Sequence, residues 1–416
     1  MKMLNWANRF SISVFLDNNE YDNHRYRFYE CLVAVEPSSV FSSGEDAAEV
    51  LDKLHEWHVQ HQDWLFGHIA YDYKNSLFKT SASSKQNRFR FPDLFFFCPQ
   101  TVCRISADKQ TLTIETVHAS PQAIFEEIQK QPLASEYHLP QINFRKRLDK
   151  EAYLQTITKL KEHIRNGDCY EINFCNEAYA TDVVLNPLAV FHQLNQSAPA
   201  PFAAFYKYNN QYLLCSSPER YLCKQGDRLI SQPIKGTIKR GKDEAEDHQL
   251  KQALSASEKD RAENIMIVDL VRNDLSISAE KGSIEVEELG GIYSYPRVHQ
   301  MISTVGGKLK KNLPFTDVLK HSFPMGSMTG APKVKVMELI EHYEPTLREL
   351  FSGSIGYITP ASDFDFNVII RSLFYNAATH YLSYQTGGAI TYDSLPEQEW
   401  EETELKAMNM ENLFRS

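Results

Sequence analysis

Short apolar runs separated by polar turns dominate the first third of the chain, and this pattern predicts strands. Four runs have the length and composition of strands: 12–16, 29–35, 64–71 and 93–102. A hairpin over 103–117 follows, and 46–61 has the spacing of an amphipathic helix. The polar segment 134–150 is the strongest internal boundary. We therefore expect two regions, 1–140 and 141–416, interwoven into one globular unit.

Longer helical patterns appear beyond this boundary. The predicted helices are 150–166, 247–273, 332–343 and a last one from Pro396 towards Leu413. The predicted strands are 172–180, 203–208, 211–215, 354–358, 366–374 and 381–386. Long antiparallel strands with segregated helices favour an α+β fold over an alternating βαβ sheet.

The stretch 217–237 has the pattern of a hairpin, with Gly226-Asp227 as the turn between two apolar runs. Folding the chain there brings Glu219 and Lys235 roughly opposite each other. They share a face in some registers, whereas a slip of one residue puts them on opposite faces. A surface ion pair on the hairpin is the alternative to a functional pair, because exposed Lys–Glu pairs are common and contribute little.

The overall charge and the cysteines restrict the classes of function. A net charge of −10 without a long basic run argues against nucleic acid or an anionic membrane surface as a partner. The seven cysteines are scattered and form no CxxC pair, which favours reduced thiols in a cytoplasmic compartment. No signal-peptide pattern opens the chain, and no apolar run approaches about 18 residues.

Two predicted helices carry carboxylates three residues apart, which places each pair on one helix face. These are Asp260 with Glu263, and Glu399 with Glu402. Lys406 lies one turn beyond Glu402 on the same side. If the helices face each other, the four carboxylates suit a hard divalent cation such as Mg²⁺. Two solvated charged faces are the alternative.

Two glycine-containing stretches offer backbone to a ligand. Gly326-Ser327-Met328-Thr329-Gly330-Ala331-Pro332-Lys333 leads into a predicted helix with Thr329 or Gly330 near its cap, and a helix start suits an anion. Gly387-Gly388-Ala389 lies between two strand-like runs, where a ligand can approach closely. Arg371 ends an apolar run and could bind a carboxylate through its planar guanidinium. An ordinary helix start, a bulge and a solvated strand end are the respective alternatives.

Together these motifs resemble the chorismate-utilising enzyme family, closely over 140–410 and weakly before it. The motifs that occur in the family's order are Gly167-Asp168, Ser217-Pro218-Glu219-Arg220, Pro233–Thr237, Ala262-Glu263-Asn264, Asp269–Asp274, Gly330–Lys333, Ile370-Arg371, Asp393-Ser394, Pro396-Glu397 and Glu402-Thr403. The resemblance implies one large α+β unit, with two antiparallel β-sheets between outer helices and the active site in a central cleft.

Lys235 lies at the centre of Pro-Ile-Lys-Gly-Thr. A Lys at this place resembles the members of the family that aminate chorismate to 4-amino-4-deoxychorismate. Anthranilate-forming members usually carry Ala there. The resemblance implies that Lys235 attacks C2, that the C4 hydroxyl leaves, and that ammonia adds at C4. A Lys can be neutral enough to attack when it is partly buried and electrostatically tuned. Glu219 is then the expected general acid for the departing hydroxyl.

The resemblance also implies the ligands of the site. Glu263 and Glu402 would bind Mg²⁺ directly, and Asp260 and Glu399 through waters. The substrate-binding residues would be Gly236, Thr237, Arg371, Lys406, Gly387, Gly388 and Ala389. No stretch after 410 suits a glutamine amidotransferase domain, and no nucleophilic Cys motif is present. We therefore expect ammonia from a separate glutamine amidotransferase subunit.

Three positions depart from the family pattern. Glu171 stands where amidating members usually have Gln and where isochorismate and salicylate synthases have a water-activating Lys. Gln300 stands where a His is frequent, with His299 one place early. Ala389 replaces the last Gly of a glycine-rich turn. An anthranilate synthase component I activity and a weakly active, partner-binding homologue remain as alternatives.

Overall fold

A computed structural model describes residues 1–21, 26–43, 49–78, 84–132 and 138–415. Its strands are β1 (Ile12–Asp17), β2 (Tyr29–Ser42), β3 (Leu65–Ile69), β4 (Leu94–Ser106), β5 (Leu112–Thr116), β6 (Arg145–Lys146), β7 (Glu171–Ala180), β8 (Phe202–Tyr208), β9 (Gln211–Ser217), β10 (Arg220–Gln225), β11 (Arg228–Gln232), β12 (Ile234–Lys239), β13 (Glu285–Ser294), β14 (Val298–Lys308), β15 (Gly330–Ala331), β16 (Ser354–Ile358), β17 (Phe364–Asn367), β18 (Ser372–Asn376) and β19 (Tyr381–Ile390).

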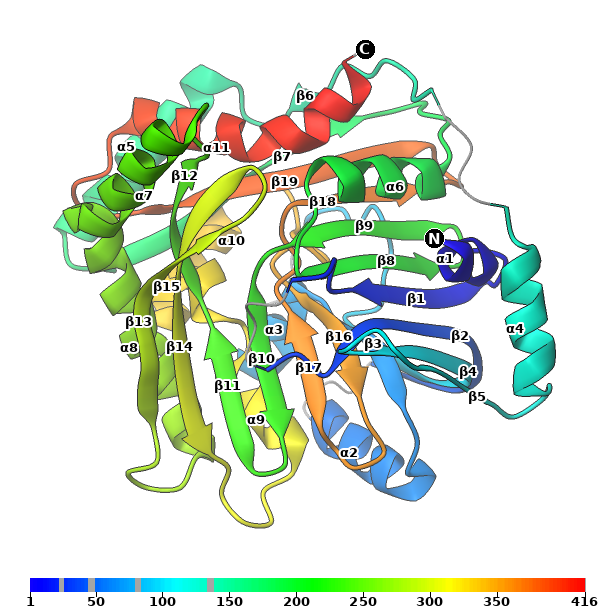
Figure 1. Cartoon of the computed structure of the whole chain (residues 1–416). Helices are drawn as coiled ribbons and strands as arrows, with labels where there is room; N and C mark the ends of the chain where they lie inside the picture. The colour runs from blue at the N-terminus through cyan, green and yellow to red at the C-terminus, as the bar shows by residue number, and fades with distance from the viewer. Residues whose placement is uncertain (22–25, 44–48, 79–83, 133–137, 416) are drawn as a thin grey trace.

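Several helices cover faces of this sheet, because they pack against strands that have a neighbour on each side (Figure 1). The helices are α1 (Lys2–Ala7), α2 (Val50–His61), α3 (Lys74–Phe78), α4 (Pro121–Lys130), α5 (Lys150–Arg165), α6 (Pro187–Ser197), α7 (Glu244–Ala256), α8 (Glu258–Ser278), α9 (Phe315–Ser322), α10 (Lys333–Tyr343) and α11 (Pro396–Glu411). Positions 46–48 of the helix predicted at 46–61 and positions 134–137 of the predicted boundary segment lie outside the described residues. None of the helices in the described ranges is both long and apolar enough to cross a membrane.

The strands pair antiparallel throughout, which confirms the predicted α+β fold. Within the described residues the hydrogen bonds join 19 strands into one continuous sheet, where two antiparallel sheets were expected. Strands from both sides of residue 140 are neighbours, because β1 pairs with β8 and β3 pairs with β16. The predicted boundary near 140 stays a prediction.

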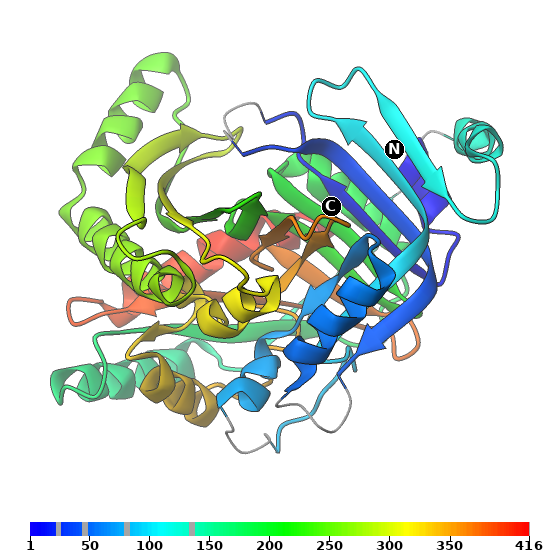
Figure 2. The same ribbon diagram turned by 90° about the horizontal axis from the view of Figure 1, so that it is seen from below.

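Two helices from distant parts of the chain bring charged side chains to the middle of the fold. α8 lies against β12 and β14, and α11 lies against β19 and α5 (Figure 1). Seen from below, the blue and cyan N-terminal strands lie on the opposite side of the molecule from the green helices α7 and α8 (Figure 2). Among the described residues, buried apolar side chains form three clusters, the largest of which spans both regions of the chain.

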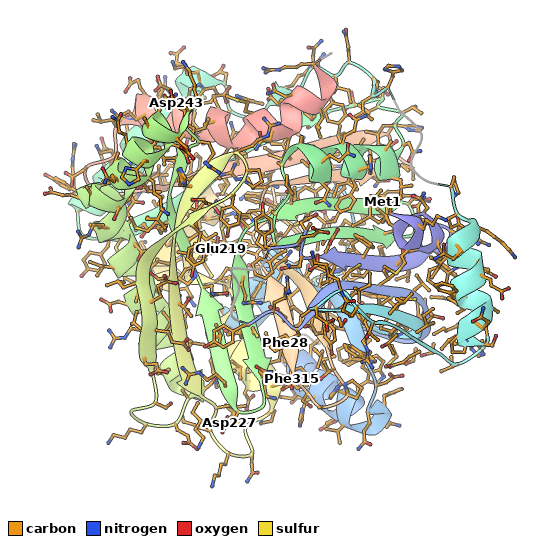
Figure 3. All side chains as sticks on the ribbon, in the orientation of Figure 1. Met1, Phe28, Glu219, Asp227, Asp243 and Phe315 are labelled. Carbon is orange, nitrogen blue, oxygen red and sulfur yellow. The ribbon has the colours of Figure 1, made fainter. Side chains whose placement is uncertain are left out.

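The predicted hairpin is confirmed as β10 and β11. Gln225 pairs with Arg228, so Gly226 and Asp227 form the turn, and Gly226 has a φ of +57° that favours glycine. Asp227 lies at the outer end of the hairpin and Glu219 in the middle of the molecule (Figure 3). The two ends of the hairpin therefore lie near the middle of the molecule, and its turn lies at the periphery.

The single helix predicted over 247–273 is wrong, since the chain forms α7 and α8 with a break at Ser257. Ser257 has extended backbone angles, and its Oγ accepts a hydrogen bond from the amide of Asp260 at 3.2 Å. Such an N-cap satisfies an amide that the start of a helix leaves free. Asp260 and Glu263 nevertheless lie on the same helix, as expected.

The single strand predicted over 366–374 is also wrong. β17 ends at Asn367 and β18 begins at Ser372, because the chain leaves β10 and β16 and joins β9 and β19. Arg371 lies in the break with a φ of +52°, a left-handed conformation that is unusual for a residue with a side chain. This turn gives Arg371 its direction into the fold.

Candidate active site

A cavity of about 550 Å³ opens between β12, β19, α8 and α11. All the predicted site residues except Glu399 line it: Glu219, Lys235, Gly236, Thr237, Asp260, Glu263, Arg371, Gly387, Gly388, Ala389, Glu402 and Lys406. Glu399 lies just behind the wall, since a Cβ built on Gly388 would be 3.2 Å from Glu399 Oε2. Asn173 and Lys259 also line the cavity and were missed by sequence reasoning, because no distinctive spacing marks them, and Ser327 lines it from within the predicted stretch 326–333.

Lys235 lies in the interior with a carboxylate partner. Its Nζ donates a hydrogen bond to Glu171 Oε1 at 2.6 Å, and the two side chains are 9% and 4% exposed. The surface-pair alternative is therefore wrong, and the direct partner of Lys235 is Glu171 and not Glu219. Burial acts to lower the pKa of Lys235, but the nearby carboxylates of Glu171 and Glu263 outweigh it and the pKa is raised. The free protein thus holds Lys235 as an ammonium, where the sequence favoured a neutral amine.

Glu219 is a buried acid beside this amine. Burial raises the pKa of Glu219 to about 7, although Ser327 and the Lys235 ammonium act to lower it. Both the amide and the carbonyl of Glu219 are hydrogen-bonded. The amide donates to Ser217 Oγ at 3.2 Å, and the carbonyl accepts from the amide of Val368 at 3.0 Å. A carboxyl with such a pKa can donate a proton near neutral pH.

Carboxylates of α8 and α11 come near each other around a shared lysine. Lys259 Nζ lies 3.5 Å from Glu399 and 3.9 Å from Glu263, and Lys406 donates to Glu402 at 2.6 Å. Attraction to the Lys406 ammonium lowers the pKa of Glu402 to about 2, despite its burial. Burial raises the pKa of Glu263 to about 7.

One observation indicates that the acidic residues suit a hard cation. Glu263 Oε1 and Glu399 Oε2 are buried and have no hydrogen-bond partner, so each has a lone pair that a cation would satisfy. Among the residues with described positions, no three His, Cys, Asp or Glu side chains already converge on one point. Lysine ammonium groups lie among the carboxylates instead.

Arg371 and Lys406 form the cationic wall of the cavity. Burial lowers the pKa of Arg371 to about 10, and Lys406 Nζ donates to the carbonyl of Gly387 at 2.7 Å. A buried guanidinium without a bound carboxylate is strongly stabilised when an anionic ligand pairs with it.

The glycines of the predicted ligand loop belong to a strand. Gly387, Gly388 and Ala389 pair with β7 inside β19, so the expected gap between two strands is wrong. A Cβ on Gly387 would be 2.4 Å from Cys175 Sγ, so a glycine here allows β19 to pack closely against β7. Gly388 makes room for Glu399 and Glu402, which lie on its open side.

The segment Gly330–Lys333 plays a different part from the predicted one. α10 begins at Lys333 with Pro332 as its N-cap, and neither Thr329 nor Gly330 caps it. Gly330 and Ala331 instead pair with Ile172 and Glu171 of β7. Within the predicted stretch 326–333, Ser327 and Met328 line the cavity, whereas residues 329–333 do not.

Gln300 and His299 face opposite sides of β14. Gln300 lines the cavity, and its buried Oε1 has no hydrogen-bond partner. His299 points away: its ring nitrogens lie 3.0 Å from Asp247 Oδ1 and 2.9 Å from Ser294 Oγ. Since successive strand residues alternate faces, His299 does not take the place of a His at 300.

A cavity of this size, lined by a buried acid, several lysines, several carboxylates and a guanidinium, suits a small anionic molecule. The chorismate binding enzyme family matches residues 15–412, so the chain belongs to that family. It is 39% identical to aminodeoxychorismate synthase component 1 of Escherichia coli over 256 residues, 62% of this chain and 56% of that protein. It is 33% identical to an anthranilate synthase component I-like protein of Synechocystis over 350 residues, 83% of this chain and 71% of that one.

The fold agrees with a solved structure of the family. Anthranilate synthase component I of Streptococcus pneumoniae superposes with a TM-score of 0.80 at 24% identity, covering 94% of this chain and 93% of that one. The chain matches 36% of the aminodeoxychorismate synthase of Streptomyces griseus, at 41% identity over 63% of this chain. The matched segment thus spans from about a third to somewhat over half of these synthases.

Proposed function

We propose that this protein aminates chorismate to 4-amino-4-deoxychorismate, with ammonia supplied by a separate glutamine amidotransferase subunit. The observation that carries the proposal is Lys235, buried in the cavity with the acid Glu219 nearby. The names of several relatives, aminodeoxychorismate synthase component 1 among them, support the same reaction and a second component.

The residues of the cavity divide the reaction between them. Lys235 is the nucleophile that bonds to C2 of the ring, and Glu219 protonates the C4 hydroxyl as it leaves. Ammonia then bonds to C4 and Lys235 departs. The enolpyruvyl group stays on the product, and no His lies at position 300 to assist its loss.

The anionic substrate needs cationic and backbone partners. Arg371 and Lys406 bind substrate carboxylate, with Thr237 and the backbone of Gly236 beside them. Because the protein carries a net charge of −10, this local positive wall must attract the substrate against the overall field.

Mg²⁺ is the proposed cofactor. Glu263 and Glu402 would hold it directly, and Asp260 and Glu399 through waters, which suits the few direct carboxylates that Mg²⁺ prefers. When bound, it supplies a positive charge that fixes the ring carboxylate. The carboxylate oxygens of Glu263 and Glu399 that have no hydrogen-bond partner support this assignment.

The test is the product formed from chorismate, MgCl₂ and ammonium salt. We expect 4-amino-4-deoxychorismate, identified by mass spectrometry. Lys235→Ala should lower its rate of formation by about 10²-fold or more, since covalent catalysis is lost. Lys239→Ala is the matched control, because Lys239 lies on the same strand and also lines the cavity.

Two results would overturn parts of the proposal. Fluorescent anthranilate as the main product would show that the chain is an anthranilate-forming member, as the Synechocystis relative suggests. Full activity of Lys235→Ala would show that ammonia attacks without a covalent step.

A further inference from the structure

Glu171 has no part in the reaction as described above, yet it makes the direct contact to the proposed nucleophile. Its Oε1 accepts from Lys235 Nζ at 2.6 Å, and both groups are almost fully buried. Glu171 does not line the cavity, so it reaches the substrate only through Lys235. A short charge-assisted hydrogen bond of this kind is also a path for a proton.

The backbone holds Glu171 in this place. Tyr170 donates from its amide to the carbonyl of Ala331 at 2.8 Å, and Asn173 does the same to Thr329 at 2.7 Å. Gly330 lies so close that a Cβ there would be 2.1 Å from the carbonyl oxygen of Glu171. Hydrogen bonds to the segment 329–331 therefore hold the backbone before and after Glu171.

Lys235 begins the reaction as an ammonium and must lose a proton before it can attack. We propose that Glu171 is the proton acceptor of Lys235, holding the amine in position before attack and taking its proton as attack begins. This inference rests on the proposed function. It assigns Glu171 as a positioning and proton-accepting residue that acts through Lys235.

The protons and electrons of the cycle balance. Glu171 takes one proton from Lys235, and the freed electron pair of Nζ bonds to C2. The ring double bonds shift, the C4–O bond breaks, and hydroxide leaves as water with the proton of Glu219. Ammonia then bonds to C4, the electrons shift back and the Nζ–C2 bond breaks.

Both acids return to their starting states. The released amine of Lys235 takes its proton back from Glu171, and the Glu219 carboxylate takes a proton from the new C4 ammonium. The net reaction is chorismate plus ammonia giving the amino product plus water. No other reactant is needed.

The test compares Glu171→Gln with the wild type in two measurements. The first is amination of chorismate across pH 6–9, with the concentration of neutral ammonia held constant. Gln keeps the size of the side chain but cannot take a proton, so we expect kcat at pH 7 to fall by about 10²-fold or more. The KM for chorismate should change little, and the variant's rate should rise with pH because hydroxide must then deprotonate Lys235.

The second measurement is labelling of Lys235 by trinitrobenzenesulfonate at pH 8 without substrate, followed by mass spectrometry. Loss of the neighbouring anion favours the neutral amine, so Lys235 should be labelled faster in Glu171→Gln than in the wild type. A structural defect that exposed the buried Lys235 would also speed its labelling, so the discriminating result is faster labelling together with turnover that recovers as the pH rises.

Two variants complete the design. Glu171→Asp keeps a carboxylate and should retain the wild-type pH profile at a reduced rate. Glu177→Gln is the matched control, because Glu177 lies buried on the same strand and binds Arg147 outside the cavity. It should leave the pH profile and the labelling unchanged.

The failures are distinguishable. If the wild type forms no aminated product, the proposed function fails and this inference fails with it. If the wild type aminates chorismate and Glu171→Gln does so equally fast or faster at pH 7, only the role of Glu171 is overturned. Glu171 would then merely keep Lys235 protonated.

Discussion

A carboxyl group buried as deeply as that of Glu219 lowers the stability of the fold whenever it ionises. Its pKa is raised from 4.5 to about 7, so the folded state binds the proton more tightly than the unfolded chain. Stability is therefore fully present below pH 4.5, falls as the pH rises to about 7, and stays low above it. The same sign holds for Glu263, which burial also shifts to about 7.

Glu219→Gln should therefore separate stability from activity. The variant removes the ionisable group, so at pH 8 we expect a gain of roughly 1–3 kcal/mol in the free energy of unfolding. At pH 4 the gain should vanish, and amination should be lost at every pH. Thermal unfolding at both pH values measures this.

Glu401→Gln serves as the control for that experiment, because Glu401 lies exposed on α11. It should change neither quantity. A Glu219→Gln protein with wild-type stability at pH 8 would show that the Glu219 carboxyl is solvated in the folded state.

The types of the site residues were accessible from the sequence, but their partners were not. Glu219 and Lys235 stand out through the prolines and glycines beside them. Glu171 lies 64 positions before Lys235, and only the folded sheet brings the two together. No local pattern encodes a contact over that distance.

At the scale of single elements, local signals explain the correct predictions and one of the errors. The β10–β11 hairpin follows from a turn sequence between two apolar runs. Ser257 three residues before Asp260 is a capping signal that the helical periodicity around it obscured. The break between β17 and β18 has no such signal, because it depends on which strands lie beside each half.

Gly330 in β15 gives a prediction about an element. Gly330→Ala should lower the free energy of unfolding by more than about 2 kcal/mol, because its φ is +134° and the new Cβ would collide with the backbone of Glu171. Amination should fall as well, since Glu171 holds Lys235. Thermal unfolding and initial rates test both expectations.

Gly167→Ala isolates the effect of backbone strain in that test. Gly167 also has a positive φ, +81°, but a Cβ there meets nothing within 4 Å. The Gly167→Ala variant should lose about 1 kcal/mol of unfolding free energy and keep its activity. Equal effects of the two substitutions would mean that close contact with β7 is unimportant.

At the scale of the whole molecule, the site joins parts of the chain that are far apart. Asp260 and Glu263 come from α8, and Glu399 and Glu402 from α11. A cation shared by the two helices would link residues about 140 positions apart, so its binding should stabilise the entire fold.

Mg²⁺ should accordingly raise the thermal midpoint of the wild type, and EDTA should reverse the shift. At a concentration about 100-fold above its Kd, a ligand of the folded state adds about 2.7 kcal/mol. Glu263→Gln and Glu402→Gln should abolish the Mg²⁺-dependent shift. Differential scanning calorimetry measures it without any need for activity.

Asp269→Asn provides the comparison, because Asp269 is an exposed acid of the same helix paired with Arg272. It should keep the wild-type response to Mg²⁺. A shift of wild-type size in the Glu263 or Glu402 variants would place the cation elsewhere.

The sequence by itself determined the fold class and the hairpin around Gly226, and through its motifs it pointed to many, though not all, of the residues that line the cavity. Those depend on local periodicity, turn residues and short motifs. The tertiary structure alone decided that Lys235 pairs with Glu171, that Arg371 turns inward, and that His299 faces away from the cavity. Each of these depends on strand register and on burial, which arise only when distant segments meet.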